Sequence, residues 1–171
     1  MELKTILNFN RQDFEEIYFK ENQGSLFFSP LTRAKTATSF ILGIILLFTY
    51  SNSSLTSSNW GFFYVFLLIF ILSAVHLLLN VHQVLKWKQS VIKYLNVISK
   101  FTSHELLVND SYLALIQDGN ETIVRWSEFK KVELGEDFIR IEGSIDFLFP
   151  RKSMSESNFL ILKELIRNNI K

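Results

Sequence analysis

Fifty consecutive residues of this chain, from Thr36 to Leu85, contain no Asp, Glu, Lys or Arg. The hydrocarbon core of a bilayer is about 30 Å thick, and a helix needs roughly 20 mostly apolar residues to cross it. The stretch is too long for one crossing and long enough for two with a turn between them. A small, polar segment at Ser51–Asn59 divides it into two apolar parts. The sequence therefore predicts a transmembrane helical hairpin, residues 33–82, with spans at 34–50 and 60–81.

Basic residues flank both predicted spans, whereas the polar segment between the spans carries no charge. Arg33 and Lys35 precede the first span. Four lysines follow the second, with no acidic residue among them: Lys86, Lys88, Lys93 and Lys100. Because basic residues concentrate on the cytoplasmic side of a membrane, we expect a multi-pass protein of the cell (inner) membrane with both termini cytoplasmic. A cleaved signal peptide is the competing interpretation of the first span, and the long acid-containing segment before it argues against this.

Residues 1–32 are expected to form a short cytoplasmic segment. Leu3–Phe9 alternates weakly between apolar and polar residues, as a short strand does. Asn10 is suited to cap a helix that runs to about residue 20, and Asp13 would place a negative charge in its first turn. The pair Ser29-Pro30 predicts a second helix start, leading directly into the first span.

Residues 83–100 continue the second span as a basic juxtamembrane helix, because apolar residues recur there at helical spacing. Two interpretations of this helix remain open and are compatible. Its apolar face packs on the protein's own soluble domain, or its lysines contact anionic lipid, each contributing about 1 kcal/mol near the surface.

Residues 101–171 form the one soluble part long enough for its own core, a cytoplasmic β domain. Turn residues separate six short runs rich in β-forming residues, which indicates an antiparallel meander. The runs are 104–108, 112–116, 122–126, 131–134, 138–141 and 145–149. A final apolar stripe predicts a C-terminal helix that begins at a capping box, Ser153 to Glu156. A strongly bent sheet capped by this helix would bury both apolar faces, so the predicted fold class is an α+β membrane protein.

Two histidines need an interpretation because ionisable residues inside a span are functional candidates by default. His76 shares a helix face with Ser73 and Asn80, and His82 lies nearer the membrane surface. A proton or metal site would need carboxylates or further ligands, and the spans supply none. We therefore interpret the face as a polar stripe that hydrogen-bonds to the first helix, with a functional role for His76 as the alternative.

Two stretches, Gly119–Val132 and Phe147–Ser155, resemble the YcxB-like family of bacterial membrane proteins. Its members are similar in layout: a short N-terminal segment, two spans, then a small β-rich domain with a C-terminal helix. By analogy, the domain is similar in plan to bacterial pleckstrin-homology-like domains. The positions that carry the resemblance are Val124, Trp126, Phe129, Val132, Pro150, Arg151 and Lys152.

The family has no established reaction, so the resemblance implies a fold and not an activity. We interpret Trp126 and Phe129 as core or domain-interface packing, with a ligand-contacting role as the alternative. Pro150, Arg151 and Lys152 are interpreted as the start of the helix with two solvated bases, with a phosphate site as the alternative.

Composition argues against most chemistries. The absence of cysteine removes disulfides, thiol catalysis and thiolate metal sites. A net charge of +1 gives no large field for binding nucleic acid, and with six glycines there is no phosphate-binding glycine loop. We expect no catalytic residue, no cofactor and no metal site.

The sequence therefore favours a membrane-anchored, non-enzymatic cytoplasmic binding or regulatory module. Anionic lipid is the expected partner of Arg33, Lys35 and the four lysines after the second span. A protein partner and a homo-oligomer remain open. The alternative is a small oligomeric transport or channel-like membrane component in which His76 matters.

Overall fold

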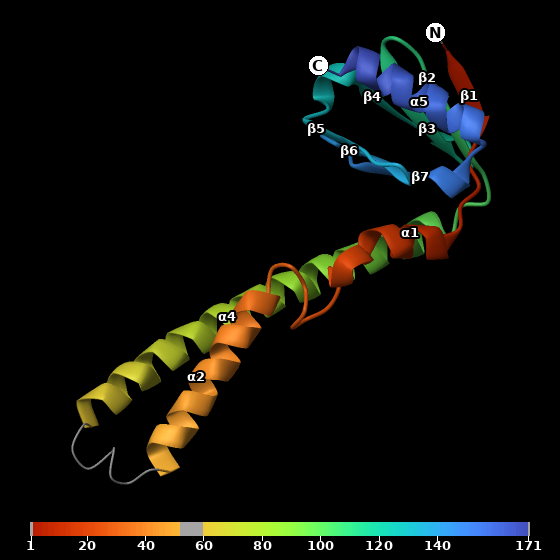
Figure 1. Ribbon diagram of the computed structural model, residues 1–171. Coiled ribbons are helices and arrows are strands. Elements are labelled where there is room, and N and C mark those ends of the chain that lie inside the picture. The colour runs from red at the N-terminus through yellow and green to blue at the C-terminus, as the bar shows by residue number, and fades with distance from the viewer. Residues whose placement is uncertain (1, 52–59, 171) are drawn as a thin grey trace. The chain divides into compact units, whose positions relative to one another are not determined.

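The computed structural model describes residues 2–51 and 60–170 (Figure 1). The predicted loop at Ser51–Asn59 lies, from residue 52 onward, outside the described residues. The chain divides into two compact units. Unit 1 consists of Met1–Ile17 with Lys93–Lys171, and unit 2 is Tyr18–Ile92. This differs from the expected organisation, in which residues 1–32 formed a segment separate from the β domain.

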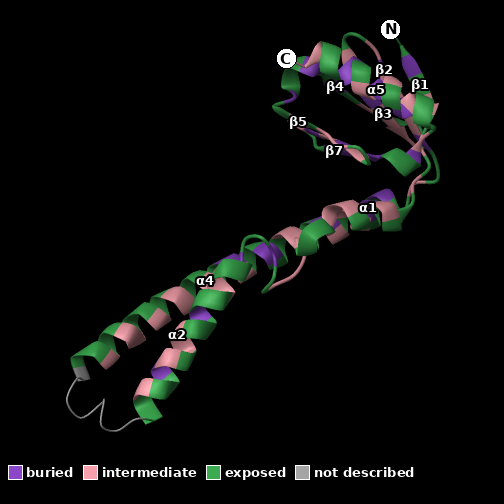
Figure 2. Ribbon diagram, in the orientation of Figure 1, coloured by how far each residue is buried: buried purple, intermediate pink, exposed green. Residues whose placement is uncertain are grey.

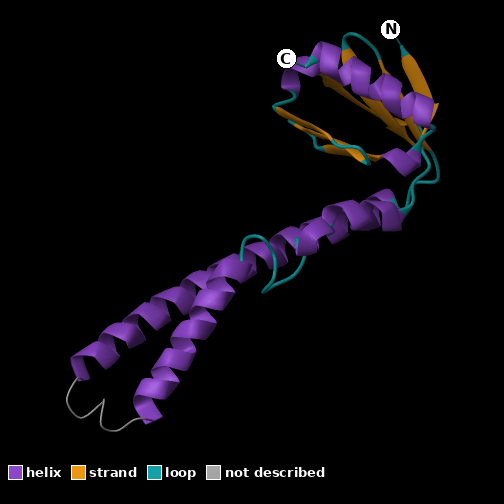
Figure 3. Ribbon diagram, viewed as in Figure 1, coloured by secondary structure: helices purple, strands orange, loops and turns teal. Residues whose placement is uncertain are grey.

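Two long helices dominate unit 2, as the sequence predicts. α2 runs from Arg33 to Ser51, and α4 runs from Trp60 to Ile98, where its last residues belong to unit 1 (Figure 3). Both are long and apolar enough to cross a membrane. At about 1.5 Å per residue, the 39 residues of α4 extend well beyond the hydrocarbon thickness of a bilayer. The helix predicted over residues 83–100 is present as far as Ile98.

α2 begins three residues after the predicted start at Pro30. The first turn is nevertheless organised by Ser29, whose carbonyl accepts hydrogen bonds from the amides of Thr32 (3.0 Å) and Arg33 (2.9 Å). The buried hydroxyls of Ser29 and Thr32 also share a hydrogen bond of 2.8 Å. Ser29 thus satisfies orphan donors of the first turn, as a capping residue does.

Unit 1 contains seven strands, the six predicted after residue 101 and the short one predicted near the N-terminus, all antiparallel to their neighbours. The first sheet has the order β1-β2-β3-β4 and the second the order β5-β6-β7. The strands are β1 (Leu3–Ile6), β2 (His104–Val108), β3 (Tyr112–Gln117), β4 (Asn120–Arg125), β5 (Lys131–Leu134), β6 (Phe138–Glu142) and β7 (Phe147–Pro150). The weak strand pattern near the N-terminus is β1, which pairs with β2 across about a hundred residues of sequence.

The expected single bent sheet is wrong, because the meander breaks after β4. Trp126, predicted to be the last residue of that strand, instead opens a 3₁₀ turn, η2 (Trp126–Glu128). Glu128 accepts from the amide of Arg125, the last residue of β4, at 3.2 Å. After this turn the chain enters the second sheet, a break that the sequence pattern did not predict.

One hydrophobic core joins both sheets to the C-terminal helix α5 (Glu156–Asn169). Buried residues lie along the strands and on the inward side of α5 (Figure 2). The largest fully buried core side chains are Phe159, Leu106, Leu113, Ile139, Ile141, Leu162, Leu165, Ile166, Val108 and Val124. Leu3 of β1 belongs to the same core, so the N-terminal strand is part of the β domain.

The N-cap of α5 is Ser155 and not the predicted Ser153. The Ser155 hydroxyl accepts from the amide of Asn158 at 3.3 Å. Ser153 is buried and donates to the carbonyl of Pro150 at 2.6 Å within the short turn η3 (Arg151–Ser153). The predicted capping box at Ser153–Glu156 is therefore wrong: Ser153 is held in the preceding turn, and the helix begins two residues later with Ser155 as a simple N-cap.

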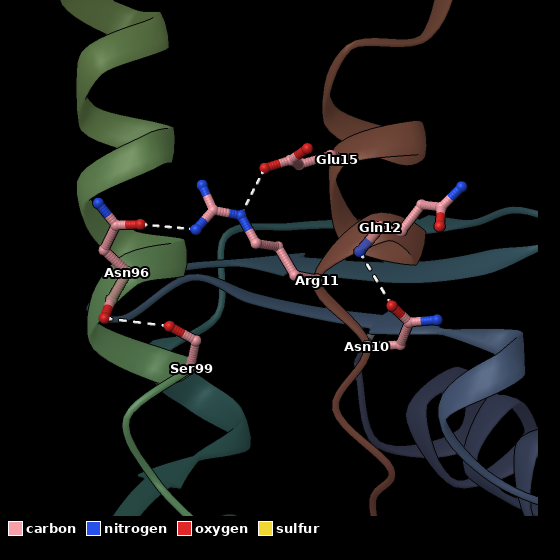
Figure 4. Close-up of polar contacts among 6 residues, drawn as sticks. All are labelled: Asn10, Arg11, Gln12, Glu15, Asn96 and Ser99. Atoms are coloured by element: carbon pink, nitrogen blue, oxygen red, sulfur yellow. Dashed lines mark hydrogen bonds and ion pairs between the residues drawn. The ribbon is translucent and has the colours of Figure 1, made fainter.

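The N-terminal helix α1 (Arg11–Tyr18) begins at its predicted cap. Asn10 Oδ1 accepts from the amide of Gln12 at 3.1 Å. Arg11 donates from Nε to Glu15 at 2.6 Å and from Nη1 to Asn96 Oδ1 at 2.8 Å, which ties α1 to the end of α4 within unit 1 (Figure 4).

Asp118 stabilises the turn between β3 and β4 and the entry to β2. Asp118 and Gly119 both have positive φ, as the central residues of a tight hairpin do. The Asp118 carboxylate accepts from the backbone amides of Thr102 (3.0 Å) and Ser103 (2.8 Å) and from both hydroxyls. Chiefly the Ser103 backbone bond, and then the Thr102 hydroxyl, hold the pKa of Asp118 below its ordinary value.

Replacing Trp126 tests the junction between the sheets. Trp126 is 7% exposed and donates from Nε1 to the Asn109 carbonyl at 2.9 Å. We expect Trp126→Ala to lower the free energy of unfolding of unit 1 by about 3–5 kcal/mol through the cavity left behind. Hydrogen exchange of strand amides in the full-length protein measures this. Ile123→Ala on β4, where the side chain is 53% exposed, is the matched control and should change little. Equal effects of the two variants would contradict the buried role.

Asp118→Asn tests the carboxylate at the hairpin, and Asn also tolerates the positive φ. The pKa of Asp118 is lower in the folded protein than in the unfolded chain. The Asp118 carboxylate therefore stabilises the fold above its unfolded pKa of about 3.9, and this stabilisation is lost as the pH falls through its folded pKa. The variant should unfold at a lower temperature than the wild type at pH 7, and the difference should shrink below about pH 4. Thermal unfolding between pH 7 and 3 measures it, and a constant difference over this range would refute the linkage.

Candidate functional site

The basic residues predicted to contact the membrane surface do not form one cluster. Arg33 and Lys35 lie in the first turn of α2 in unit 2. Lys86 and Lys88 lie on the part of α4 that belongs to unit 2, whereas unit 1 contains the other two, Lys93 and Lys100. Lysines seven residues apart share a helix face, so Lys86 and Lys93 lie on one side of α4 and Lys88 on nearly the opposite side.

The side chains of these residues differ in what they touch. Lys88 Nζ lies 5.9 Å from the centre of the Phe19 ring, a cation–π distance. The Phe19 ring also meets Trp87 edge to face at 5.8 Å. Lys86 is exposed. Lys35 is half-buried, and its Nζ lies 3.2 Å from Nε2 of His76.

Polar side chains line the contact between α2 and α4. The hydroxyls of Ser39 and Ser73 share a hydrogen bond of 2.8 Å, and the Lys35–His76 contact lies one turn away. Asn80 on the same face of α4 is 5% exposed, and its Nδ2 has no partner among residues 2–51 and 60–170. The predicted polar stripe that hydrogen-bonds to the first helix is thus confirmed.

The apolar face of the juxtamembrane helix is covered by the protein itself. Val84 and Val91 are buried in unit 2, and Leu95 and Ile98 are buried in unit 1. The first of the two open interpretations, packing on the soluble domain, therefore fits Leu95 and Ile98, whereas Val84 and Val91 are buried within unit 2. Lys86 and Lys93 stay exposed, so a lipid contact of the basic face remains compatible with this packing.

The positions that carry the family resemblance are mainly structural. Val124, Trp126 and Phe129 are buried in the core of unit 1, and Val132 packs against that core. The Trp126 and Phe129 rings lie 5.8 Å apart. This burial fits their interpretation as core packing.

Two bases follow Pro150, the buried last residue of β7, and both are held by carboxylates. Arg151 pairs with Glu156 in the first turn of α5. Lys152 Nζ lies 3.4 Å from Glu16 and 3.5 Å from Asp13, and these carboxylates, Glu16 first, raise the pKa of Lys152. Each base is exposed, but each has an acidic partner, so the phosphate-site alternative has no support in this geometry.

Sequence reasoning missed a small pocket around His104 in unit 1. The His104 ring is 5% exposed, and its Nδ1 lies 3.0 Å from the amide nitrogen of Gln117. The other ring nitrogen, Nε2, is buried without a hydrogen-bond partner among the described residues. Phe9 and Phe101 approach the ring at 5.5 and 6.2 Å between centroids. The pocket is mostly apolar, with Phe14, Ile98, Leu115 and Phe149 also in its wall.

Burial decides the charge of this histidine. It lowers the pKa of His104, and the nearby Asp118 carboxylate, followed by a backbone hydrogen bond with Phe101, opposes the shift only partly. The imidazole is therefore neutral at pH 7. In the tautomer in which the Gln117 amide donates to Nδ1, the ring proton sits on Nε2, which has no hydrogen-bond partner among the described residues.

A sequence signal for this pocket existed. β2 alternates buried and half-buried residues, and His104 shares its inward face with Leu106 and Val108. The period-two pattern therefore places His104 inside the domain, although it does not identify the residues opposite.

Among residues 2–51 and 60–170, no group of three or more His, Asp or Glu side chains is placed to hold a metal ion. Comparison with family models, with curated proteins and with solved structures finds no match. The functional assignment therefore depends on the geometry of the two units.

Proposed function

We propose that this protein is a membrane-anchored, non-enzymatic binding module, in which α2 and α4 form a membrane-inserted hairpin and unit 1 lies in the cytoplasm. By its resemblance to the YcxB-like family, we place it in a bacterial inner membrane. The β domain would carry the binding function, as the pleckstrin-homology-like plan implies.

The distribution of polarity in the hairpin carries the proposal. The hydroxyls of Ser39 and Ser73 share a hydrogen bond between the helices, and Asn80 of α4 is buried. Large apolar side chains lie on the outside, including Phe40, Leu47, Phe48, Phe62, Leu68, Leu72 and Leu78. The most apolar stretch of α4 contains no buried residue. A core helix of a water-soluble protein has the opposite pattern, whereas lipid covers such an apolar surface and favours polar contacts between helices.

The pairing of β1 with β2 supports two membrane crossings, and this argument does not use the basic residues that flank the two helices. Leu3 lies opposite Val108 and Ile6 opposite Glu105. The two strands flank α2 and α4 in the sequence. Because paired strands share one compartment, the chain between them must cross the membrane an even number of times. This argues against a cleaved signal peptide, and the flanking lysines favour the cytoplasmic side.

An exposed apolar segment before α2 fits the same orientation. Phe28 is 69% exposed, and Phe27 and Leu31 beside it are also exposed. The Thr36 hydroxyl donates to the carbonyl of Phe27 at 3.0 Å, which fixes the segment to α2. Aromatic and apolar side chains next to basic residues are typical of the membrane–water interface.

The His104 pocket is the site that we assign to binding. The pocket has a volume of about 30 Å³, so its apolar wall and the unpartnered Nε2 suit only a neutral ligand of a few heavy atoms with one acceptor oxygen. A ligand of this kind would satisfy Nε2 without bringing a charge into an apolar site.

Introduced cysteines test the topology, since the chain has none of its own. We expect a membrane-impermeant maleimide to label Ser54→Cys on intact cells. Glu2→Cys and Glu136→Cys should react only after the membrane is opened. Labelling of Glu2→Cys or Glu136→Cys on intact cells, or recovery of the protein in the soluble fraction, would overturn the anchored, cytoplasmic assignment.

Ligand titration tests the pocket in the full-length protein in lipid nanodiscs, with ¹⁵N-labelled histidine side chains. We expect 2-butanone to shift the His104 ring signals saturably and to leave His82 unchanged, because only His104 lines the pocket. Phe9→Ala should strengthen binding by enlarging the pocket, and His104→Phe should abolish it. If neither 2-butanone nor n-butanol produces a saturable shift in the wild type or in Phe9→Ala, the pocket is not a site for such ligands.

A further inference from the structure

A cleft opens between α2 and α4 beside the Lys35–His76 contact. Its polar wall consists of Lys35, Thr38, Ser73 and His76, and its apolar wall includes Ile69 and Leu72. Both apolar residues are exposed on the outside of the hairpin. The cleft therefore joins a polar pocket to the surface that the proposed function places in lipid.

The Lys35 ammonium in this cleft has no acidic partner on α2 or α4. Lys35 Nζ donates one hydrogen bond to His76 Nε2 at 3.2 Å, and an imidazole that accepts this bond is neutral at that nitrogen. Neither α2 nor α4 contains an Asp or Glu. An ammonium group with three donors at the edge of an apolar medium is stabilised by an anion, so the missing group is one that the protein's own helices do not supply.

The depth of the cleft indicates which anion is available. Lys35 precedes the end of α2 at Ser51 by sixteen residues, and His76 follows the start of α4 at Trp60 by the same number. At about 1.5 Å per residue, both lie roughly 24 Å from the far ends of these helices. A hydrocarbon core of about 30 Å then puts the cleft near its cytoplasmic boundary, beside the phosphate groups of the inner leaflet.

We infer that this cleft binds one anionic phospholipid through its phosphate. Lys35 is the cation that contacts the phosphate, and His76 holds the ammonium at the mouth of the cleft. The acyl chains lie along Ile69 and Leu72. Cation pockets between membrane helices on the cytoplasmic side bind lipid headgroups in this way. The inference rests on the proposed insertion of α2 and α4, and it adds a defined lipid site to the general attraction of the surface lysines.

Native mass spectrometry of the full-length protein released from nanodiscs tests the site. With equal phosphatidylglycerol and phosphatidylcholine, we expect one phosphatidylglycerol molecule to stay bound. Lys35→Gln should weaken its retention at least about tenfold, since a hydrogen bond to a charged group is lost. Lys35→Arg should retain the lipid. Lys86→Gln removes an exposed lysine of α4 and is the matched control, with retention unchanged.

Other outcomes separate the alternatives. Equal retention in Lys35→Gln and the wild type would overturn the cleft as the lipid site. Displacement of the lipid by millimolar inorganic phosphate would assign the cleft to a soluble anion and overturn the lipid. Labelling of Ser54→Cys in the same samples reports insertion separately, so a failed anchor is distinguishable from an inserted hairpin that holds no lipid.

Discussion

The contact between α2 and α4 pairs polar groups inside a hairpin whose outer surface is apolar. The Ser39–Ser73 and Lys35–His76 contacts set one antiparallel register, and the same register brings Ser51 level with Trp60 at the helix ends. Between apolar helices in lipid, dispersion alone is nearly the same for helix and lipid partners, so hydrogen bonds and small residues decide the pairing. A slip by one residue would separate both pairs at once, which makes this register the constraint on which the proposed anchor depends.

The β domain depends on a different constraint, the break in the meander after β4. A seven-stranded flat sheet would leave one apolar face uncovered, and a single short helix is too small to cover it. The 3₁₀ turn at Trp126–Glu128 sends β5–β7 into a second sheet, so each sheet covers part of the other and α5 closes the same core. Trp126 takes part in both steps, because it ends the first sheet and fills the space between the two.

The sequence predicted most elements because each has a local signature. Charge-free length predicted α2 and α4, alternation with turn residues predicted the strands, and Asn10 predicted the start of α1. Pairing and packing over long distances carry no such signature. The partner of β1 lies about a hundred residues away in the sequence. The sequence predicts a strand at Trp126 because tryptophan is common in strands. The His104 pocket was missed for the same reason: alternation places His104 inward, but only the fold brings Phe9 and Gln117 to its ring.

The discontinuity of unit 1 in the sequence also constrains how the chain assembles. β1 is synthesised first, yet its hydrogen-bonding partner β2 follows both long helices. Closing so long a loop by chance costs conformational entropy that grows with loop length. The pairing of β1 with β2, which brings Leu3 into the core of unit 1, must therefore offset this entropy cost.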